Sequence, residues 1–251
     1  MELHEKTIII TGASGGIGAA AARLFAREGA NLVLGARRVA ELSALAEEIR
    51  DDGGQAIHMA GDVTDPLFST ALVDLAESTF GSLDGAFNNA GVMGDMISVP
   101  EMSLENWQDV LNTNLTGAFL SVRAQIAALQ RGKGGAVVFT SSFVGHSNGG
   151  MPGMAAYAAS KAGMIGMMKS LTCDHAAEGI RINAVLPGGT LTDMAGTDPD
   201  VHAFISDLHP VKRMAAPEEI AQSALFLLSD RASFVTGAAL LADGGISVRL
   251  T

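Results

Sequence analysis

The length, composition and charge of this chain exclude several classes of protein. With 251 residues, 48% of them hydrophobic, it is long enough to bury one large core, yet no apolar run reaches the ~20 residues that a membrane-spanning helix needs. A formal net charge of −11 argues against nucleic acid or an anionic membrane as the main partner. Cys173 is the only cysteine, so no internal disulfide can form, and the first residues lack the profile of a signal peptide; both features predict a cytoplasmic protein.

The chain begins with a strand, a glycine-rich turn and a helix in immediate succession. Residues 6–11 are rich in β-branched side chains and predict a buried strand, and an alanine-rich helix follows the glycines. Glycines let a pyrophosphate approach the backbone closely, and the start of a helix offers free N–H donors. The spacing Thr11-Gly12-x-x-x-Gly16-x-Gly18 is not the commonest fingerprint, so a tight turn without a ligand is the alternative to a dinucleotide site.

Two arginines follow the second predicted strand, residues 31–35. In a dinucleotide fold, an acid ~20 residues beyond the glycine turn binds the 2′-hydroxyl of NAD, but that count leads from Gly16 to Ala36. Arg37 and Arg38 come next, and guanidinium groups bind phosphate through paired hydrogen bonds. This arrangement favours NADP(H) as the cofactor, with NAD(H) as the second choice. The alternative is two solvated arginines at the start of a helix.

The rest of the chain alternates between strand and helix patterns. Strands are predicted at residues 55–61, 83–88, 136–141, 180–185 and 238–242, and helices at 39–51, 66–80, 104–130, 155–177 and 217–229. This alternation predicts an α/β fold, a single domain over residues 1–251 with one doubly wound parallel sheet and helices on both faces. Ligands of such sheets bind at the carboxyl ends of the strands, where the polar and glycine-rich groups of this chain fall. Residues 190–210, the least regular part, are predicted to form a substrate flap.

Tyr157 and Lys161 stand four residues apart in a predicted helix, so their side chains share one face. A free tyrosine titrates near pH ~10, too high for an efficient proton donor at neutral pH, and a neighbouring cation lowers the pKa of the phenol. The pair therefore predicts a general acid or base. The alternative is an ordinary helical pair with a solvated lysine.

Further motifs complete a series along the chain. Asn-Asn-Ala-Gly stands at residues 88–91, Pro-Gly at 187–188 and Asp-Gly-Gly at 243–245, with Asn114 and Ser142 between them. Together with the glycine turn and Tyr-x-x-x-Lys, the series resembles the short-chain dehydrogenase/reductase family, ~250-residue enzymes similar to 3-oxoacyl-(acyl-carrier-protein) reductases, over nearly the whole chain. The resemblance implies a Rossmann fold and NADPH-dependent, reversible reduction of a carbonyl to an alcohol.

The resemblance also implies a catalytic tetrad of Asn114, Ser142, Tyr157 and Lys161. Tyr157 would protonate the carbonyl oxygen, Ser142 would donate a hydrogen bond to it, and Asn114 would anchor a water that relays protons to Lys161. Lys161 would hold the ribose and, with the charge of the oxidised ring, lower the pKa of Tyr157. Ser141 is the rival for the serine role. The interval from Ser142 to Tyr157 exceeds the family's usual one, which places a loop at residues 146–153.

The cofactor site implied by the resemblance extends across the same edge of the sheet. Asp62 and Val63 would contact the adenine, the second motif the adenosine side, and residues 187–192 the nicotinamide end. The predicted cofactor-binding residues are Gly12, Ser14, Gly16, Ile17, Gly18, Arg37, Arg38, Asp62, Val63, Asn89, Ala90, Gly91, Tyr157, Lys161, Pro187, Gly188, Thr190 and Thr192. No set of His, Cys, Asp and Glu has metal-ligand spacing, so no catalytic metal is expected.

Several questions stay open at this point. The substrate is a small carbonyl or alcohol compound: a 3-oxoacyl thioester, a sugar or uronate ketone, or a hydrophobic ketone. Met93, Phe143, Met151 and Met194 predict an apolar wall, whereas Lys212 and Arg213 favour an anionic tail. The three residues between Tyr157 and Lys161, unlike the six of divergent enoyl reductases, favour carbonyl chemistry.

Family resemblance also implies a homotetramer or homodimer, packed through the helix at 155–177 and its predecessor. Met164, Met167 and Met168 are expected in the core or a subunit interface, and Cys173 as a small buried or interface residue. His146 is close enough in sequence to touch substrate, although a lone loop histidine is more often incidental. A redox sensor or scaffold that binds NADP(H) without turnover is the alternative function.

Overall fold

The protein is built on a seven-stranded parallel sheet with the strand order β3-β2-β1-β4-β5-β6-β7, which confirms the predicted fold class. The computed structural model describes residues 1–147 and 150–249. The strands are β1 (Thr7–Thr11), β2 (Asn31–Ala36), β3 (Gln55–Ala60), β4 (Gly85–Asn88), β5 (Gly135–Thr140), β6 (Ile180–Pro187) and β7 (Ala239–Ala242). The order reverses between β1 and β4, and this point is where a doubly wound sheet opens a crevice for ligands.

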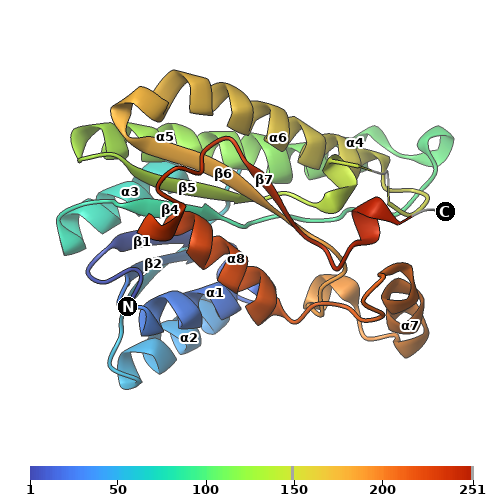
Figure 1. Ribbon diagram of the computed structural model, residues 1–251, viewed down its shortest axis with the longest axis horizontal. Helices are drawn as coiled ribbons and strands as arrows, with labels where there is room; N and C mark the ends of the chain where they lie inside the picture. The colour runs from blue at the N-terminus through green and yellow to red at the C-terminus, as the bar shows by residue number, and fades with distance from the viewer. Residues whose placement is uncertain (148–149, 250–251) are drawn as a thin grey trace.

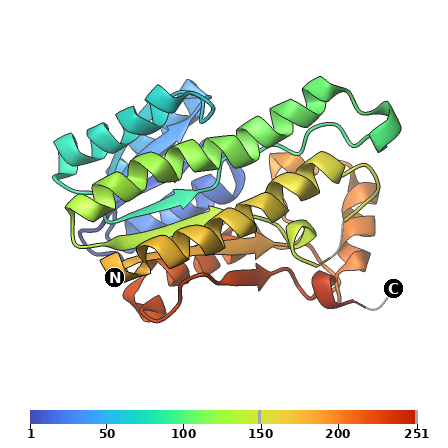
Figure 2. The ribbon, with the colours of Figure 1, turned by 90° about the horizontal axis from the view of Figure 1, so that it is seen from above.

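Helices cover both faces of the sheet (Figure 1). On one face lie α1 (Gly16–Arg27), α2 (Val39–Asp51) and α8 (Pro217–Leu228), and on the other α3 (Pro66–Phe80), α5 (Gly117–Arg131) and α6 (Ala155–His175). Figure 2 shows α5 and α6 side by side across the sheet. Alternation along β1 explains the two cores, because Ile8 and Ile10 pack on the first set of helices and Ile9 on the second.

The long helix predicted at residues 104–130 is interrupted. It consists of α4 (Leu104–Leu111), a wider π-helical turn (Asn112–Thr116) and α5. A π turn holds one residue more than an α turn and occurs mostly at functional sites. Hydrophobic periodicity cannot distinguish such a turn from regular helix, since the apolar stripe continues on both sides of it.

The predicted flap, residues 190–210, contains a helix that the sequence pattern did not indicate. This helix, α7 (Pro199–Leu208), starts with Asp198, whose carboxylate accepts a hydrogen bond of 2.9 Å from the Asp200 N–H, and with Pro199 at its first position. None of its residues is fully buried. The apolar stripe is therefore too weak to predict the helix, although the capping residues were a valid signal.

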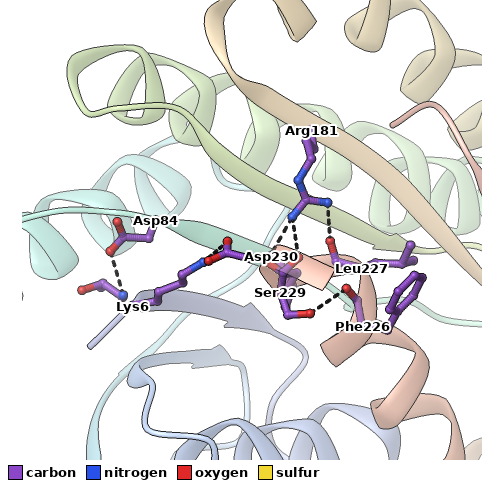
Figure 3. Close-up of polar contacts among 9 residues, drawn as sticks. Lys6, Asp84, Arg181, Phe226, Leu227, Ser229 and Asp230 are labelled. Atoms are coloured by element: carbon purple, nitrogen blue, oxygen red, sulfur yellow. Dashed lines mark hydrogen bonds and ion pairs between the residues drawn. The ribbon is translucent and has the colours of Figure 1, made fainter. Parts of the chain in front are cut away.

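At the amino ends of the strands, Arg181 of β6 binds the end of α8 (Figure 3). Its guanidinium donates to the carbonyl oxygens of Leu227 at 2.8 Å, Leu228 at 3.2 Å and Ser229 at 3.1 Å. These are among the carbonyls that a helix leaves unpaired at its C-terminus. Burial lowers the pKa of Arg181, and the nearby Asp230 carboxylate opposes that shift. The guanidinium thus holds the C-terminal end of α8 through three carbonyl groups.

Replacing Arg181 with Met is expected to destabilise the protein by about 2 kcal/mol, because hydrogen bonds to a charged group are lost while the aliphatic stem is kept. For a chain of this length, that loss corresponds to a decrease of about 4–8 °C in the melting temperature. Thermal unfolding followed by circular dichroism measures it. A melting temperature equal to that of the wild type would show that water replaces the guanidinium at the helix end.

No helix in the described ranges is long and apolar enough to cross a membrane.

Candidate active site

A cavity of about 540 Å³ opens at the carboxyl ends of the strands. Its floor is formed by the glycine turn after β1, and its sides by the segments that follow β2, β3, β4, β5 and β6. Residues of the flap segment and of α7 line it from the opposite side. The predicted position of the site is therefore the position of this cavity.

The glycine turn is shaped so that side chains cannot fill it. Gly12 has a φ of 68°, and a Cβ atom there would lie 2.8 Å from the Ala90 Cα. A Cβ at Gly18 would overlap the carbonyl oxygen of Gly12. The Thr11 hydroxyl accepts hydrogen bonds from the N–H groups of Asn89 at 3.1 Å and Ala90 at 3.3 Å, which joins the first and fourth strand ends. This cradle, at an α1 start that no side chain caps, fits a pyrophosphate.

The two arginines after β2 differ in their contacts. Arg38 donates to the Ser14 hydroxyl and to the Ser14 carbonyl, both at 3.1 Å, and lies 3.6 Å from carboxylate oxygens of Glu41 and Asp193. Arg37 is exposed at the cavity edge and makes no hydrogen bond or ion pair with any described residue. Among the described residues, Arg37 thus keeps its hydrogen-bond donors unused, whereas Arg38 supports the glycine turn.

Asp62, beside Arg37, lines the same end of the cavity. Its carboxylate accepts hydrogen bonds from the N–H and the hydroxyl of Thr64, both at 2.9 Å. The Thr64 N–H hydrogen bond is the main reason that the pKa of Asp62 lies below its ordinary value. Asp62 is therefore an ionised acceptor.

Tyr157 and Ser142 meet at the opposite end of the cavity. The Ser142 hydroxyl forms a hydrogen bond with the Tyr157 phenol and accepts a bond of 3.3 Å from the Val144 N–H. The Ser141 hydroxyl instead donates to the backbone carbonyl of Lys161 at 2.9 Å. The geometry therefore separates the two serines, because only Ser142 presents its hydroxyl beside the phenol.

Lys161 is buried, and its ammonium donates to the carbonyl oxygen of Thr140 at 2.7 Å. The ammonium lies 5.5 Å from the centre of the Tyr157 ring. Burial lowers the pKa of Lys161 from 10.5 to about 8. Burial also raises the pKa of Tyr157 above its ordinary value, while the Ser142 hydrogen bond acts in the opposite direction. The expected lowering of this pKa by Lys161 is not found, since desolvation of the phenol dominates within the protein.

Asn114 lies in the π turn, behind the cavity wall. Its side chain accepts from the Val92 N–H and donates to the Val92 carbonyl, both at 2.8 Å, and donates to the Ser160 hydroxyl at 3.0 Å. It therefore fixes the segment after β4 against α6, and it does not line the cavity. The wider turn explains how a helical residue reaches both neighbours.

His209 was not predicted from the sequence, which offers no signal for it. The residue is buried and lines the cavity. Its Nε2 accepts a hydrogen bond of 3.0 Å from the Gly189 N–H, so Nδ1 carries the proton and donates to the Ile205 carbonyl at 2.7 Å. His209 thereby connects α7 to the segment that follows β6.

Most predicted site residues lie together. Every predicted cofactor-binding residue except Gly18 lines the cavity. Three members of the predicted tetrad, Ser142, Tyr157 and Lys161, line it as well. Asn114 and Gly18 lie behind the lining and support it. Met93, Met151 and Met194 line the cavity as expected, but Phe143 and His146 do not. Of the loop predicted at 146–153, positions 148 and 149 lie outside the described residues. No group of three His, Cys, Asp or Glu that could hold a metal occurs among the described residues.

Known proteins resemble this chain over almost its whole length. The profile of a family described as "Enoyl-(Acyl carrier protein) reductase" matches residues 12–247. The cyclohexanol dehydrogenase of Acinetobacter sp. (strain SE19) is 38% identical, covering 97% of this chain and 95% of its own. The L-rhamnose 1-dehydrogenase (NAD(P)(+)) of Azotobacter vinelandii is 40% identical over 100% of both chains.

A solved structure shares the fold as well. The crystal structure of a short-chain type dehydrogenase/reductase from Mycobacterium marinum superposes with a TM-score of 0.94 at 34% identity, covering 99% of this chain and 98% of the other. Sequence, fold and cavity lead to one family. The chain is a member of the short-chain dehydrogenase/reductase family.

Proposed function

We propose that this protein is an NADPH-dependent carbonyl reductase that also works in reverse as an alcohol dehydrogenase. Enzymes of its family are oxidoreductases that act on alcohols and carbonyls with a nicotinamide cofactor. The observation that carries the proposal is the hydrogen-bonded pair of Ser142 and Tyr157, with the Lys161 ammonium 5.5 Å from the phenol ring, at one end of a glycine-lined cavity.

Each side chain has a task in this proposal. When bound, NADPH supplies the hydride. The Tyr157 hydroxyl donates its proton to the carbonyl oxygen, and the Ser142 hydroxyl donates a hydrogen bond to the same oxygen. The Lys161 ammonium stabilises the phenolate that Tyr157 becomes. Asn114 acts from behind the wall as a positioning residue, since its side-chain bonds end on Val92 and Ser160.

NADPH is the preferred cofactor in this proposal because Ala36 offers no carboxylate to a ribose hydroxyl and Arg37 is free for a 2′-phosphate. The proposal is tested by measuring the decrease in absorbance at about 340 nm as NADPH or NADH is oxidised. The substrates compared are thioesters, sugar acids and plain ketones. Turnover with NADPH on one class supports it. Tight NADPH binding without turnover on any carbonyl compound would favour a sensor or scaffold instead.

Carbonyl reduction is expected to slow as the pH rises through about 8, the pKa of Lys161. The phenol stays protonated in this range, because burial raises the pKa of Tyr157, so Lys161 is the group that titrates. Its loss of charge removes the cation that stabilises the phenolate, and kcat/KM should fall by up to about tenfold per pH unit on the alkaline side. Rates measured between about pH 6 and pH 10 at constant ionic strength check this. A constant rate up to the alkaline end contradicts it.

We further propose that the enzyme is a single-domain homotetramer in the cytoplasm. Phe119 on α5 and Leu104 on α4 are exposed large hydrophobic side chains, as a subunit interface through these helices requires. Cys173 on α6 is exposed in the single chain, so the expectation of a buried residue is wrong, and its place in an interface remains part of this proposal. Light scattering coupled to size-exclusion chromatography measures the assembly.

A further inference from the structure

Methionines form one side of the cavity to an unusual degree. The chain has 12 methionines, and six of them, here called the methionine wall, line this single cavity. They come from segments that lie far apart in the sequence, which the fold brings together. The methionine wall consists of Met93, Met96, Met151, Met154, Met194 and Met214.

The methionine wall adjoins the proton donors. Met154 stands directly before α6, the helix that carries Tyr157 in its first turn. The Met154 sulfur accepts a hydrogen bond of 3.3 Å from the Met151 N–H. A Cβ atom at Gly150 would lie 2.8 Å from that sulfur and 2.9 Å from Val144, whose N–H binds Ser142. Apolar side chains therefore stand beside the segments that carry the reacting hydroxyls of Ser142 and Tyr157.

The two cationic residues that follow α7, Lys212 and Arg213, are already paired. Lys212 lies 2.7 Å from Asp207, and Arg213 lies 2.6 Å from Glu219. The sequence prediction that Lys212 and Arg213 favour an anionic tail therefore loses its support. Asp193, on the flap segment, faces Arg38 at 3.6 Å. An anionic tail could therefore use Lys212 or Arg213 only by breaking one of these ion pairs.

Three of the neutral polar residues that line the cavity are also committed to partners within the protein. His209 uses both ring nitrogens on backbone groups, Ser141 donates to the Lys161 carbonyl, and the Thr190 hydroxyl donates to the Gly188 carbonyl at 3.1 Å. A sugar brings several hydroxyl groups that lose water on entering such a site, and each costs free energy unless it finds a partner. A single carbonyl oxygen needs only Ser142 and Tyr157.

We propose, building on the function proposed above, that the substrate is an uncharged ketone with an apolar body, which the methionine wall encloses. In the reduction, the carbonyl carbon gains a hydride from NADPH, which becomes NADP⁺, and the oxygen gains the Tyr157 proton as the C=O π bond is converted to C–H and O–H bonds. Methionine side chains are unbranched and polarizable, so they adapt to differently shaped apolar groups. The enzyme accordingly accepts a range of apolar ketones and rejects charged or polyhydroxylated ones.

The test compares ketones of one shape that differ only at a remote position: cyclohexanone, its 4-methyl and 4-ethyl derivatives, and 4-oxocyclohexanecarboxylate. Each added methylene should raise kcat/KM about fourfold, and the carboxylate should lower it by at least about 100-fold. Calorimetry of the matching alcohols with the NADPH-loaded protein, which cannot turn over, should give the same order of affinities.

Substitution of the wall provides a second arm. Met151→Lys should reduce the discrimination against the carboxylate by about tenfold or more, since an ammonium now faces it. Met102→Lys, which changes a methionine outside the cavity, is the matched control and should leave the discrimination unchanged. Melting curves of both variants show whether they are folded. If they are not, the wild-type protein decides between an apolar and an anionic substrate, through its relative activity on the 4-ethyl ketone and the carboxylate.

Two results overturn the inference in different ways. If the carboxylate or an aldose is reduced at least as well as the apolar ketones, the substrate class is wrong and carbonyl reduction with NADPH still stands. If no carbonyl compound is reduced and no alcohol binds to the NADPH-loaded protein, the proposed function fails and this inference fails with it.

Discussion

Replacing Tyr157 with Phe is expected to lower kcat for carbonyl reduction by about 10³-fold, within the range typical of general acids. The ring stays in place, so the cavity keeps its shape, but the hydroxyl to which this proposal assigns the proton transfer is gone. The dissociation constant for NADPH, measured by fluorescence titration, should change by less than about threefold, because the glycine turn and Arg37, to which this proposal assigns the phosphates, are unchanged.

The two neighbouring serines provide a matched control for this experiment. Ser142→Ala should also lower kcat, by about 10²-fold, since a hydrogen bond to the reacting oxygen is lost. Ser141→Ala removes a bond to the Lys161 carbonyl instead, and should affect the melting temperature more than kcat. A fully active Tyr157→Phe enzyme, or a larger loss of kcat in Ser141→Ala than in Ser142→Ala, would refute the assigned roles.

Replacing Arg37 with Ala is expected to raise the dissociation constant for NADPH by about 10- to 100-fold, the value of one or two hydrogen bonds from a charged donor. NADH lacks the 2′-phosphate, so its dissociation constant should change little. Arg37 is exposed and forms no hydrogen bond or ion pair within the described chain, and its charge contributes only the smallest of the causes that lower the pKa of Asp62, so its removal should change stability little. Titration of both cofactors against the same preparation measures the selectivity.

Arg38→Ala is the informative comparison. Because Arg38 binds the Ser14 hydroxyl and carbonyl, its loss should loosen the glycine turn and weaken both cofactors by similar factors. The ratio of the two dissociation constants therefore separates a phosphate ligand from a residue that shapes the turn. Equal weakening of NADPH and NADH in Arg37→Ala would remove the basis for the cofactor preference.

The sequence predicted those parts of the fold in which local and tertiary preferences agree. The helices at Val39–Asp51 and Pro66–Phe80 have their predicted boundaries. Both have an apolar stripe, and the second also has a clear start signal in Asp65 and Pro66. The observed strand boundaries differ from the predicted ones by one or two residues. A strand ends where its hydrogen bonds to the neighbouring strand end, and the side-chain pattern does not show that point.

The parts that the sequence could not predict depend on contacts between distant segments. His209 has two backbone partners, Gly189 and Ile205, and a single histidine in a loop gives no sign of either. The raised pKa of Tyr157 depends on how fully the phenol is enclosed, which the Tyr-x-x-x-Lys spacing does not contain. Phe143 was expected in the apolar wall of the cavity, but it opens a short 3-10 helix, Phe143–Gly145, and does not line the cavity.

The π turn at Asn112–Thr116 has a consequence for deletions in this region. Removing one of its residues would convert it to regular helix, a locally favourable change, and the shortened turn would still cover about the same rotation around the helix axis. Val122, Ile126 and Leu129 of α5 would therefore stay buried against the sheet. The residues within the turn would be displaced instead, so a one-residue deletion should leave the fold intact and break the hydrogen bonds of Asn114 to Val92 and Ser160.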